Sequence, residues 1–562
     1  MRTSKIYINL ILGGFLLMTS CTKRLVDLNE NPNGADPSST NPNLVLSTVL
    51  TESGKALVNF GYLDIAGVMQ HTQKDGWGGG HNNYDWGGSN DWSGYYGILR
   101  NEKFVYDKAV EQDLPLQQGV SLVMKSLMFG MITDIWGNAP YTQALNGADG
   151  GGENTFPVYD DQQTIYTGIL ADLEEANTIL SAGSFNSTMG SADVYYAGDV
   201  SKWRKFANSL ALRYYMRLSN KLPDIARAGI EKIVNDPDKY PIITSASDDA
   251  TMHFPGNSES DSWPAYAVPQ SDSSNYRRIK MCNTLVTKLL AFNDPRITVW
   301  ANPVQISILL DQTLGGNVSR VVYDTVINGE TRNVRIISSG YLASKGLSTD
   351  DIDQDPHYVG LPVALNAPQL YNLSPDPSQA AHNPHVSWVN STFANSKGVP
   401  VRIMSAAEVH FILAEASAVY GWNAGDAETH YKNGIKASFD AWGLSTAYND
   451  YINQPELAFD GSQEQIITQK WIASWSMALE AWFDWRRTGY PELHGVENRT
   501  KAKELPLRLY YPLEERNLNS TNVNAAEGKL ETTQYSAFGD DGSANSPWSK
   551  PWVIQGTGKP WE

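Results

Sequence analysis

The chain has 562 residues, a formal net charge of −18 and only two cysteines. This length is sufficient for a large hydrophobic core, so the fold can be stable without disulfides. The excess of acidic groups repels phosphate backbones, and nucleic acid is therefore excluded as a partner. Aromatic residues are abundant, with 17 Trp and 28 Tyr, and many lie in polar, glycine-rich stretches that lack the pattern of core helices.

The first residues have the pattern of a secretory signal. Two basic residues precede an apolar run, 6–18, that is too short to span a bilayer. The run ends at small residues directly before Cys21. A cysteine in this place resembles the lipobox of bacterial lipoproteins, where the signal is cleaved and the thiol is acylated. The alternative is an ordinary secretory signal followed by a cysteine by chance. We expect a signal peptide over residues 1–20, lipidation of Cys21 and a lipidated tether over residues 21–40.

Lipidation of the first cysteine has a consequence for the second. If Cys21 carries lipid, Cys282 has no partner for a disulfide in the mature chain. An exported body without disulfides depends on its core alone. We expect no further membrane span in the rest of the sequence, so the lipid is the predicted membrane attachment.

Apolar residues recur at helical spacing in two parts of the chain. The predicted helices cover residues 41–62, 92–112, 116–135, 159–180, 201–221, 224–235, 403–420, 426–442 and 463–485. They form a predicted helical scaffold over about 41–235 and 403–517. The pairs within 201–235 and 403–442 resemble helix hairpins of the tetratricopeptide kind.

The middle third of the chain has a different composition. Residues 236–402 are rich in Pro, Ser and Asp and show long loops. Alternating residues around Asn328-Gly329, a dipeptide favoured by tight hairpin turns, predict one β-hairpin over 320–337. We therefore expect a mainly α fold class and a single domain over 41–562, with this loop-rich segment inserted as a ligand face that carries a small β element.

Several aromatic residues lie in loops whose neighbours are glycine, asparagine and serine. Flat apolar faces beside polar edges suit sugar rings, which stack and are hydrogen-bonded around their rims. We expect at least two of three loop groups to converge on one face; the alternative for each ring is that it packs its loop onto the core. The candidate ligand-binding residues are Trp77, His81, Tyr84 and Trp86 in the first group, Trp263 and Tyr266 in the second, and Trp388 in the third.

Four stretches, taken together and in order, carry a family resemblance. They are residues 27–33 (DLNENPN), 129–142 (FGMITDIWGNAPYT), 469–491 (with EAWFDWRRTGYP at its end) and 508–512 (RLYYP). In combination they closely resemble the signatures of SusD/RagB-family proteins, and the first is similar to a subgroup that begins with Asn-Pro-Asn.

The resemblance implies a fold and a function. The expected fold is an α-helical body with tetratricopeptide-like hairpins and a loop-rich ligand face. The expected function is a lipoprotein, exposed on the outer membrane, that captures oligosaccharides or, in some branches, peptides. Such proteins act as a lid on a TonB-dependent β-barrel transporter. The matched motifs are expected to be scaffold and not ligand contacts.

The sequence carries little support for catalysis or for metal binding. A helical, Trp-rich exported protein can be a glycoside hydrolase with two carboxylates, but the sequence motifs of metalloproteases, serine hydrolases and phosphate loops are absent from the sequence. The acidic run 351–355 resembles a calcium loop, yet Pro356 and Pro362 stand where that loop needs Gly and Glu. His382 and His385 are read as an ordinary loop. We expect a non-catalytic protein with no metal and no cofactor. Among the candidate functions, glycan capture is favoured over peptide capture, and peptide capture over glycoside hydrolysis.

Overall fold

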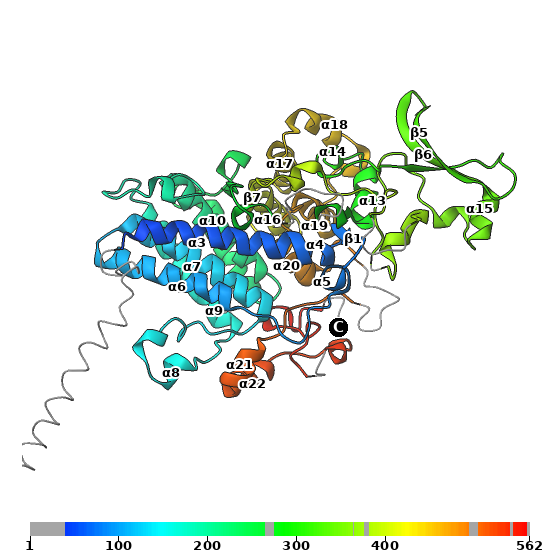
Figure 1. Ribbon diagram of the computed structural model, residues 1–562. Coiled ribbons are helices and arrows are strands. Elements are labelled where there is room, and N and C mark those ends of the chain that lie inside the picture. Colours follow the sequence, from blue (N-terminus) through cyan, green and yellow to red (C-terminus); the bar gives the residue numbers. More distant parts are fainter. Residues whose placement is uncertain are drawn as a thin grey trace, which may run out of the picture.

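The structure is a computed structural model, and it describes residues 40–264, 275–363, 365–375, 382–493, 504–539 and 543–558. Cys21, the predicted signal peptide and almost all of the predicted tether lie outside the described residues, and so does Tyr266. Two helix-rich parts of the chain pack together through α10 (Val200–Arg217) and α16 (Ala406–Ala418). The residues between these parts carry most of the strands and protrude at one end (Figure 1).

The long helices of the N-terminal part lie side by side (Figure 1). The helices here are α3 (Pro42–Val58), α4 (Ile65–Val68), α5 (Gly79–Asn83), α6 (Ser93–Glu111), α7 (Pro115–Trp136), α8 (Gly152–Thr155), α9 (Gln162–Leu180), α10 (Val200–Arg217) and α11 (Pro223–Asn235). A π-helical turn, Asn59–Asp64, joins α3 to α4. The Asn41 side chain caps α3 by accepting the Asn43 N–H, and Pro223 is the first residue of α11. The six helices predicted in this part are confirmed.

The C-terminal part adds a second set of helices. They are α16 (Ala406–Ala418), α17 (Ala427–Ala441), α18 (Tyr448–Ile452), α19 (Gln463–Ala473), α20 (Leu479–Thr488), α21 (Leu513–Leu518) and α22 (Ser520–Glu527). The prediction of one continuous helix over 463–485 is wrong, because the chain breaks between α19 and α20. Ser476 there has a φ of +71°, which no right-handed helix accommodates.

Close helix contacts depend on glycine at two positions. A Cβ at Gly434 of α17 would lie 2.9 Å from the ring of Phe411 on α16, and one at Gly130 of α7 would lie 2.0 Å from the Tyr214 hydroxyl on α10. Such small residues let the helices approach closely. The pairs α10–α11 and α16–α17 pack as the predicted helix hairpins, and the fold is mainly α as expected.

Short strands join distant parts of the chain. Strand β1 (Thr72–Lys74) pairs antiparallel with β3 (Ile279–Met281), and β2 (Ala250–Met252) pairs antiparallel with β7 (Val401–Met404). The first pairing sets Thr72 opposite Met281 and Lys74 opposite Ile279. Residues that follow β1 therefore lie beside residues that precede β3, although about 200 positions separate them in the sequence.

The predicted hairpin is present and extends away from the helices (Figure 1). A three-stranded sheet has the order β4 (Ser307–Leu310), β6 (Glu330–Ile337), β5 (Ser319–Ile327), with β4 parallel and β5 antiparallel to β6. Asn328 and Gly329 both have positive φ, as a type I′ turn requires. Helices α12 (Asn275–Arg278), α13 (Asn283–Ala291), α14 (Ile297–Trp300) and α15 (Ser339–Ser344) complete the middle third.

One hydrophobic core extends from Leu46 to Ile554 and takes side chains from most of the helices. Helix α7 lies inside this core. Within the described residues it is the one helix whose length and hydropathy would suffice to cross a bilayer, and nearly all of its most apolar window is buried. The expectation that no such stretch follows the signal peptide is wrong. The environment of α7 is that of a core helix, because packed side chains surround it.

Candidate functional site

The family-signature motifs meet in the interior of the helical body. The Trp136 indole donates to the Tyr510 carbonyl at 2.9 Å, and Arg508 donates to the Trp136 carbonyl at 3.1 Å. Arg486 donates to the carbonyls of Asp134 and Leu507 at 2.8 and 2.6 Å. The side chains of three motifs that are far apart in sequence thus connect the same buried region.

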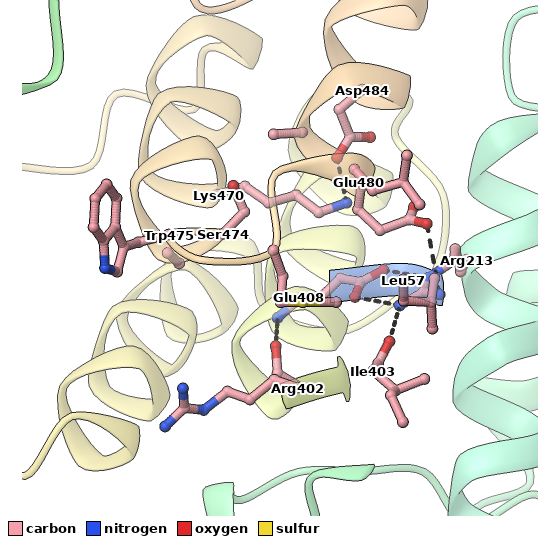
Figure 2. A pocket seen from close by; sticks show the side chains of 15 residues that line it. Leu57, Arg213, Arg402, Ile403, Glu408, Lys470, Ser474, Trp475, Glu480 and Asp484 are labelled. Atoms are coloured by element: carbon pink, nitrogen blue, oxygen red, sulfur yellow. Dashed lines mark hydrogen bonds and ion pairs between the residues drawn. The ribbon is translucent and has the colours of Figure 1, made fainter. Parts of the chain in front are cut away.

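Buried ion pairs surround a small cavity between α10, α16, α19 and α20 (Figure 2). Arg213 contacts the Glu408 carboxylate at 2.7 Å through both Nε and Nη2, and Lys470 contacts Asp484 at 2.7 Å. The volume is about 60 Å³, which leaves room for water and not for a sugar ring. This cavity belongs to the scaffold.

Charged residues of α20 pair within the helix and with neighbouring helices. Arg487 contacts Asp484 at 2.9 Å, three positions earlier, and Glu415 of α16 at 2.6 Å. Glu480 contacts Arg217 of α10 at 2.5 Å. Burial opposes ionisation of Asp484, yet the charges of Lys470 and Arg487 hold the pKa of its carboxyl well below the usual range.

Trp77 is the exposed aromatic side chain of the first loop group. It follows β1, has a φ of +48° and keeps 63% of its surface accessible. Arg278 directly precedes β3, the strand that pairs with β1. Its guanidinium carbon lies 4.2 Å from the centre of the Trp77 ring. This distance is that of a close cation–π contact.

Trp388 is placed beside the same strand. It forms a backbone bridge with Lys280 of β3 and is 9% exposed. The guanidinium carbon of Arg277 lies 4.9 Å and the Lys280 ammonium 5.2 Å from the centre of its ring. Arg277 and Arg278 are consecutive in the sequence. Adjacent residues therefore contact Trp388 of the third loop group and Trp77 of the first.

A buried ion pair adjoins the Trp388 ring. Lys280 and Asp75 are both fully buried, with their charged atoms 3.3 Å apart. Lys280 also donates to the Asn383 carbonyl at 3.3 Å, and Asp75 accepts the Asn383 N–H at 3.0 Å. Burial lowers the pKa of the Lys280 ammonium, and the arginine charges lower it further against the effect of Asp75.

His382 lies next to this ion pair. Both of its ring nitrogens are buried and have no hydrogen-bond partner. Burial and the charge of Lys280 lower the pKa of His382 to about 4, so the imidazole is neutral at pH 7. We name the set Trp77, Arg277, Arg278, Lys280, His382 and Trp388 the β3 site.

The other aromatic candidates of the first group pack against the body. Tyr84 is buried in a left-handed conformation. Trp86 is half-buried with its ring edge toward Trp482, at 6.3 Å between centres. His81 is buried within 3.0 Å of the Thr72 hydroxyl, and burial lowers its pKa well below the usual value. In this structure, Trp77 alone of the four candidates lies at the surface.

Trp263, from the second group, lies in the core. It is 1% exposed, and its ring centre is 5.0 Å from that of Tyr62 and 5.9 Å from that of Phe393. Trp263 thus packs its loop onto the helices, which is the alternative that the sequence left open. Its predicted companion Tyr266 lies outside the described residues.

Sequence reasoning missed the basic residues of the β3 site. Their signal is the run Arg277-Arg278-Ile279-Lys280, three cations within four residues of a strongly acidic chain. These residues contact Trp77, about 200 positions earlier, and Trp388, about 110 positions later. Only the pairing of the strands brings them together.

Among the larger hollows of the helical body, two border α6. One, of about 570 Å³, lies between α3 and α6 and includes Lys55 and Arg100. The other, of about 550 Å³, lies between α6, the turn after α7 and the start of α21, and includes Trp92 and Tyr96. Neither contains any of the predicted ligand-binding residues.

Comparison with known proteins gives consistent results. Residues 36–512 match the model of the SusD-like family, described as "Starch-binding associating with outer membrane". A SusD homologue from Bacteroides fragilis is similar with a TM-score of 0.69 at 21% identity, over 92% of this chain and 100% of that chain. No curated protein matches the chain.

Two further solved structures have the same coverage. One is a candidate nutrient-binding outer-membrane protein from Bacteroides vulgatus, with a TM-score of 0.67 at 23% identity over 92% of this chain and 100% of that chain. The other is a chitin-binding protein, also with a TM-score of 0.67 at 23% identity over 92% and 100% of the two chains. At these identities the structures show a shared fold. Because the family model covers most of the sequence and the fold agrees with it, the chain belongs to the SusD-like family of outer-membrane-associated proteins.

Proposed function

We propose that this protein is a cell-surface lipoprotein that captures oligosaccharides and delivers them to a TonB-dependent outer-membrane transporter without catalysis. In this proposal residues 1–20 are a signal peptide, Cys21 carries the lipid, residues 21–40 tether the body to the outer membrane, and residues 41–562 form one SusD-like domain. The family description supports outer-membrane association and binding of starch-like ligands.

The observation that carries the proposal is the exposed ring of Trp77, which lies against the Arg278 guanidinium. A tryptophan with most of its surface accessible is unusual in a body that buries Trp136, Trp203, Trp263 and Trp300 almost completely. Its ring offers a flat apolar surface, and the cations beside it offer hydrogen-bond donors for hydroxyl groups. This combination suits a sugar ring better than a peptide backbone, which adds to exposed strand edges.

Calorimetry against a panel of glycans and peptides tests the proposal. Trp77→Ala should lower the affinity for the bound glycan about tenfold, since an aromatic contact contributes up to about 1.5 kcal/mol and about 1.4 kcal/mol is a factor of ten. The matched control is Tyr323→Ala, an equally exposed aromatic residue (66%) on the distant hairpin, which should bind as the parent does.

Three results would contradict the proposal. Binding of peptides and of no glycan would favour the peptide-capturing alternative. Release of reducing sugar by the purified protein would establish a glycosidase. An unchanged glycan affinity in Trp77→Ala would show that the glycan does not bind at the β3 site.

A further inference from the structure

The two hollows that border α6 adjoin each other. The first, of about 570 Å³, lies between α3 and α6, which run side by side (Figure 1). The second, of about 550 Å³, lies between α6, the segment 140–157 and the start of α21. Gly97 and Arg100 line both hollows, and each volume is within the roughly 300–1,000 Å³ that is usual for ligand sites. We name the two adjoining hollows the α6 groove.

Glycine keeps the groove open where its two halves meet. Gly94 and Gly97 lie in α6, and a Cβ at either position would meet nothing within 4 Å in the part of the chain that the structure describes. Packing therefore does not require glycine at these positions, although glycine is unfavourable inside a helix. A side chain at position 97 would enter the space that the two hollows share.

The hollow beside α3 offers polar groups next to aromatic rings. Phe60 and Tyr95 line it, and both are half-buried. The side chains of Asn59, Arg100 and Asn101 also line it, and they have no hydrogen-bond or ion-pair partner among the described residues. Amide groups donate and accept hydrogen bonds, and a guanidinium donates them. This half of the groove suits the ring faces and hydroxyl groups of sugars.

The hollow beside α21 has a mainly apolar wall. Apolar surface also continues outside it, because Phe156 and Val158 flank a lining residue in the sequence and are exposed, as is Leu513. Apolar surface of this extent around a cavity indicates a binding place for an apolar group. The apolar residues of the wall include Pro140, Ala144, Leu145, Ala148, Pro157 and Pro512.

The wall of this hollow is held in place by the rest of the chain. The Asn519 amide donates to the Pro157 carbonyl at 2.8 Å. The Asn522 amide donates to the Phe156 carbonyl at 3.0 Å. Leu145 has a φ of +67°, a backbone conformation that is unfavourable for a residue with a Cβ and that recurs at ligand sites. The hollow is thus formed before a ligand arrives, which lowers the entropic cost of binding.

Charged groups at the same hollow narrow the kind of substituent that it accepts. Asp91, Glu514 and Glu515 line it together with Arg100. An anionic substituent would be repelled by the three carboxylates, and a cationic substituent would meet the guanidinium. The group that fits best is therefore uncharged.

We propose that the α6 groove binds oligosaccharides that carry an uncharged apolar substituent, an acyl or an aryl group. The sugar rings occupy the hollow beside α3, and the substituent occupies the hollow beside α21. The inference rests on the proposed function, because the ligand is again a glycan, and it adds a second binding place to that of Trp77. Trp77 lines neither hollow, so the two places can be tested separately.

Calorimetry with the purified full chain and matched probes tests the inference. One neutral oligosaccharide is prepared in an unsubstituted form, an acylated form, an aryl-substituted form and an amine-bearing form. An acylated or aryl-substituted form should bind about tenfold more tightly than the unsubstituted form, and comparison of these two forms identifies the substituent. The amine-bearing form should gain no affinity.

Substitutions then locate the effect. Gly97→Leu fills the junction of the two hollows and should abolish the tenfold gain, while the affinity for the unsubstituted form stays unchanged. Ala148→Asp, at an exposed position of the apolar wall, should reduce the same gain. The matched control is Gly315→Leu, since a Cβ at Gly315 also meets nothing within 4 Å and this glycine lies outside both hollows. Circular dichroism and thermal melting show whether each variant is folded.

The outcomes separate this inference from the proposed function. Equal affinity for the substituted and unsubstituted forms overturns the inference and leaves glycan capture intact. Tighter binding of the amine-bearing form overturns the apolar ligand class. A gain that persists in folded Gly97→Leu and Ala148→Asp variants overturns the assignment to the α6 groove. Binding of no carbohydrate in any form overturns both the inference and the proposed function.

Discussion

Tryptophans in similar loops have opposite environments in this molecule. Trp77 and Trp263 both lie in polar stretches next to small residues, yet one is 63% exposed and the other 1%. The difference comes from partners that are distant in sequence: Tyr62 and Phe393 enclose Trp263, whereas Arg278 lies against Trp77. Local composition made both rings candidates for ligand binding. Whether each ring is buried or exposed depends on contacts with residues that are distant in the sequence, and a single sequence does not show these contacts.

Charged residues of the signature motifs stabilise the fold through buried ion pairs. Asp484 gives the clearest prediction. Its carboxylate lies between the Lys470 ammonium at 2.7 Å and the Arg487 guanidinium at 2.9 Å, and all three are buried. Asp484→Asn leaves two buried cations without this counter-charge. The free energy of unfolding should fall by about 3–5 kcal/mol at pH 7, measured by urea denaturation.

The effect of this substitution should depend on pH in a defined direction. The folded-state pKa of Asp484 is depressed, so its contribution is complete above the unfolded value of about 4 and is lost as the pH falls through the folded value. The difference between parent and variant should therefore narrow below about pH 4. The control Asp440→Asn breaks a surface pair with Lys436 and should change stability by less than about 1 kcal/mol; an equal loss in both variants would contradict the assignment.

At the level of elements, periodicity predicted where helices exist better than where they end. Helix α16 is mostly apolar and mostly buried. The break between α19 and α20 was missed because apolar spacing continues through it. There the Trp471 indole donates to the Met69 carbonyl at 2.8 Å, and the Trp475 ring stacks on Trp300 at 5.5 Å. These contacts with distant residues favour a turn that local pattern does not show.

The contact between α16 and α17 gives a prediction about a single methyl group. At Gly434 a Cβ would lie 2.9 Å from the ring of Phe411, which is fully buried in the core, and protein cores are closely packed. Gly434→Ala should lower the free energy of unfolding by about 1–3 kcal/mol, despite the better helix propensity of Ala.

Gly97 provides the matched control for this substitution. It lies in α6, and a Cβ there would meet nothing within 4 Å. Gly97→Ala should therefore raise stability by about 0.5–1 kcal/mol. If both alanine variants shifted the thermal midpoint in the same direction, the close packing of α16 on α17 would not be the reason for glycine at position 434.

At the level of the whole molecule, the sequence predicted the set of helices and the hairpin but not their mutual placement. Pairing of β1 with β3, and packing of α10 on α16, join residues about 200 positions apart. Periodicity reports which face of an element is buried and not which element covers it. The β3 site is a product of such long-range pairing, so only its separate parts were visible in the sequence.

The proposed anchor connects the whole molecule to its function. If Cys21 carries the lipid, binding and uptake are separable, because the β3 site is built from residues of the folded body and the lipid only holds that body at the membrane.

Cys21→Ala should bind the same glycan with unchanged affinity in calorimetry, yet fail to incorporate labelled fatty acid and fail to support growth on that glycan. Lys23→Ala, two residues along, leaves the lipidation site in place and should retain both properties. Loss of glycan binding in a folded Cys21→Ala protein would contradict the separation of anchor and binding face. Growth equal to that of the parent would show that capture does not require the lipid.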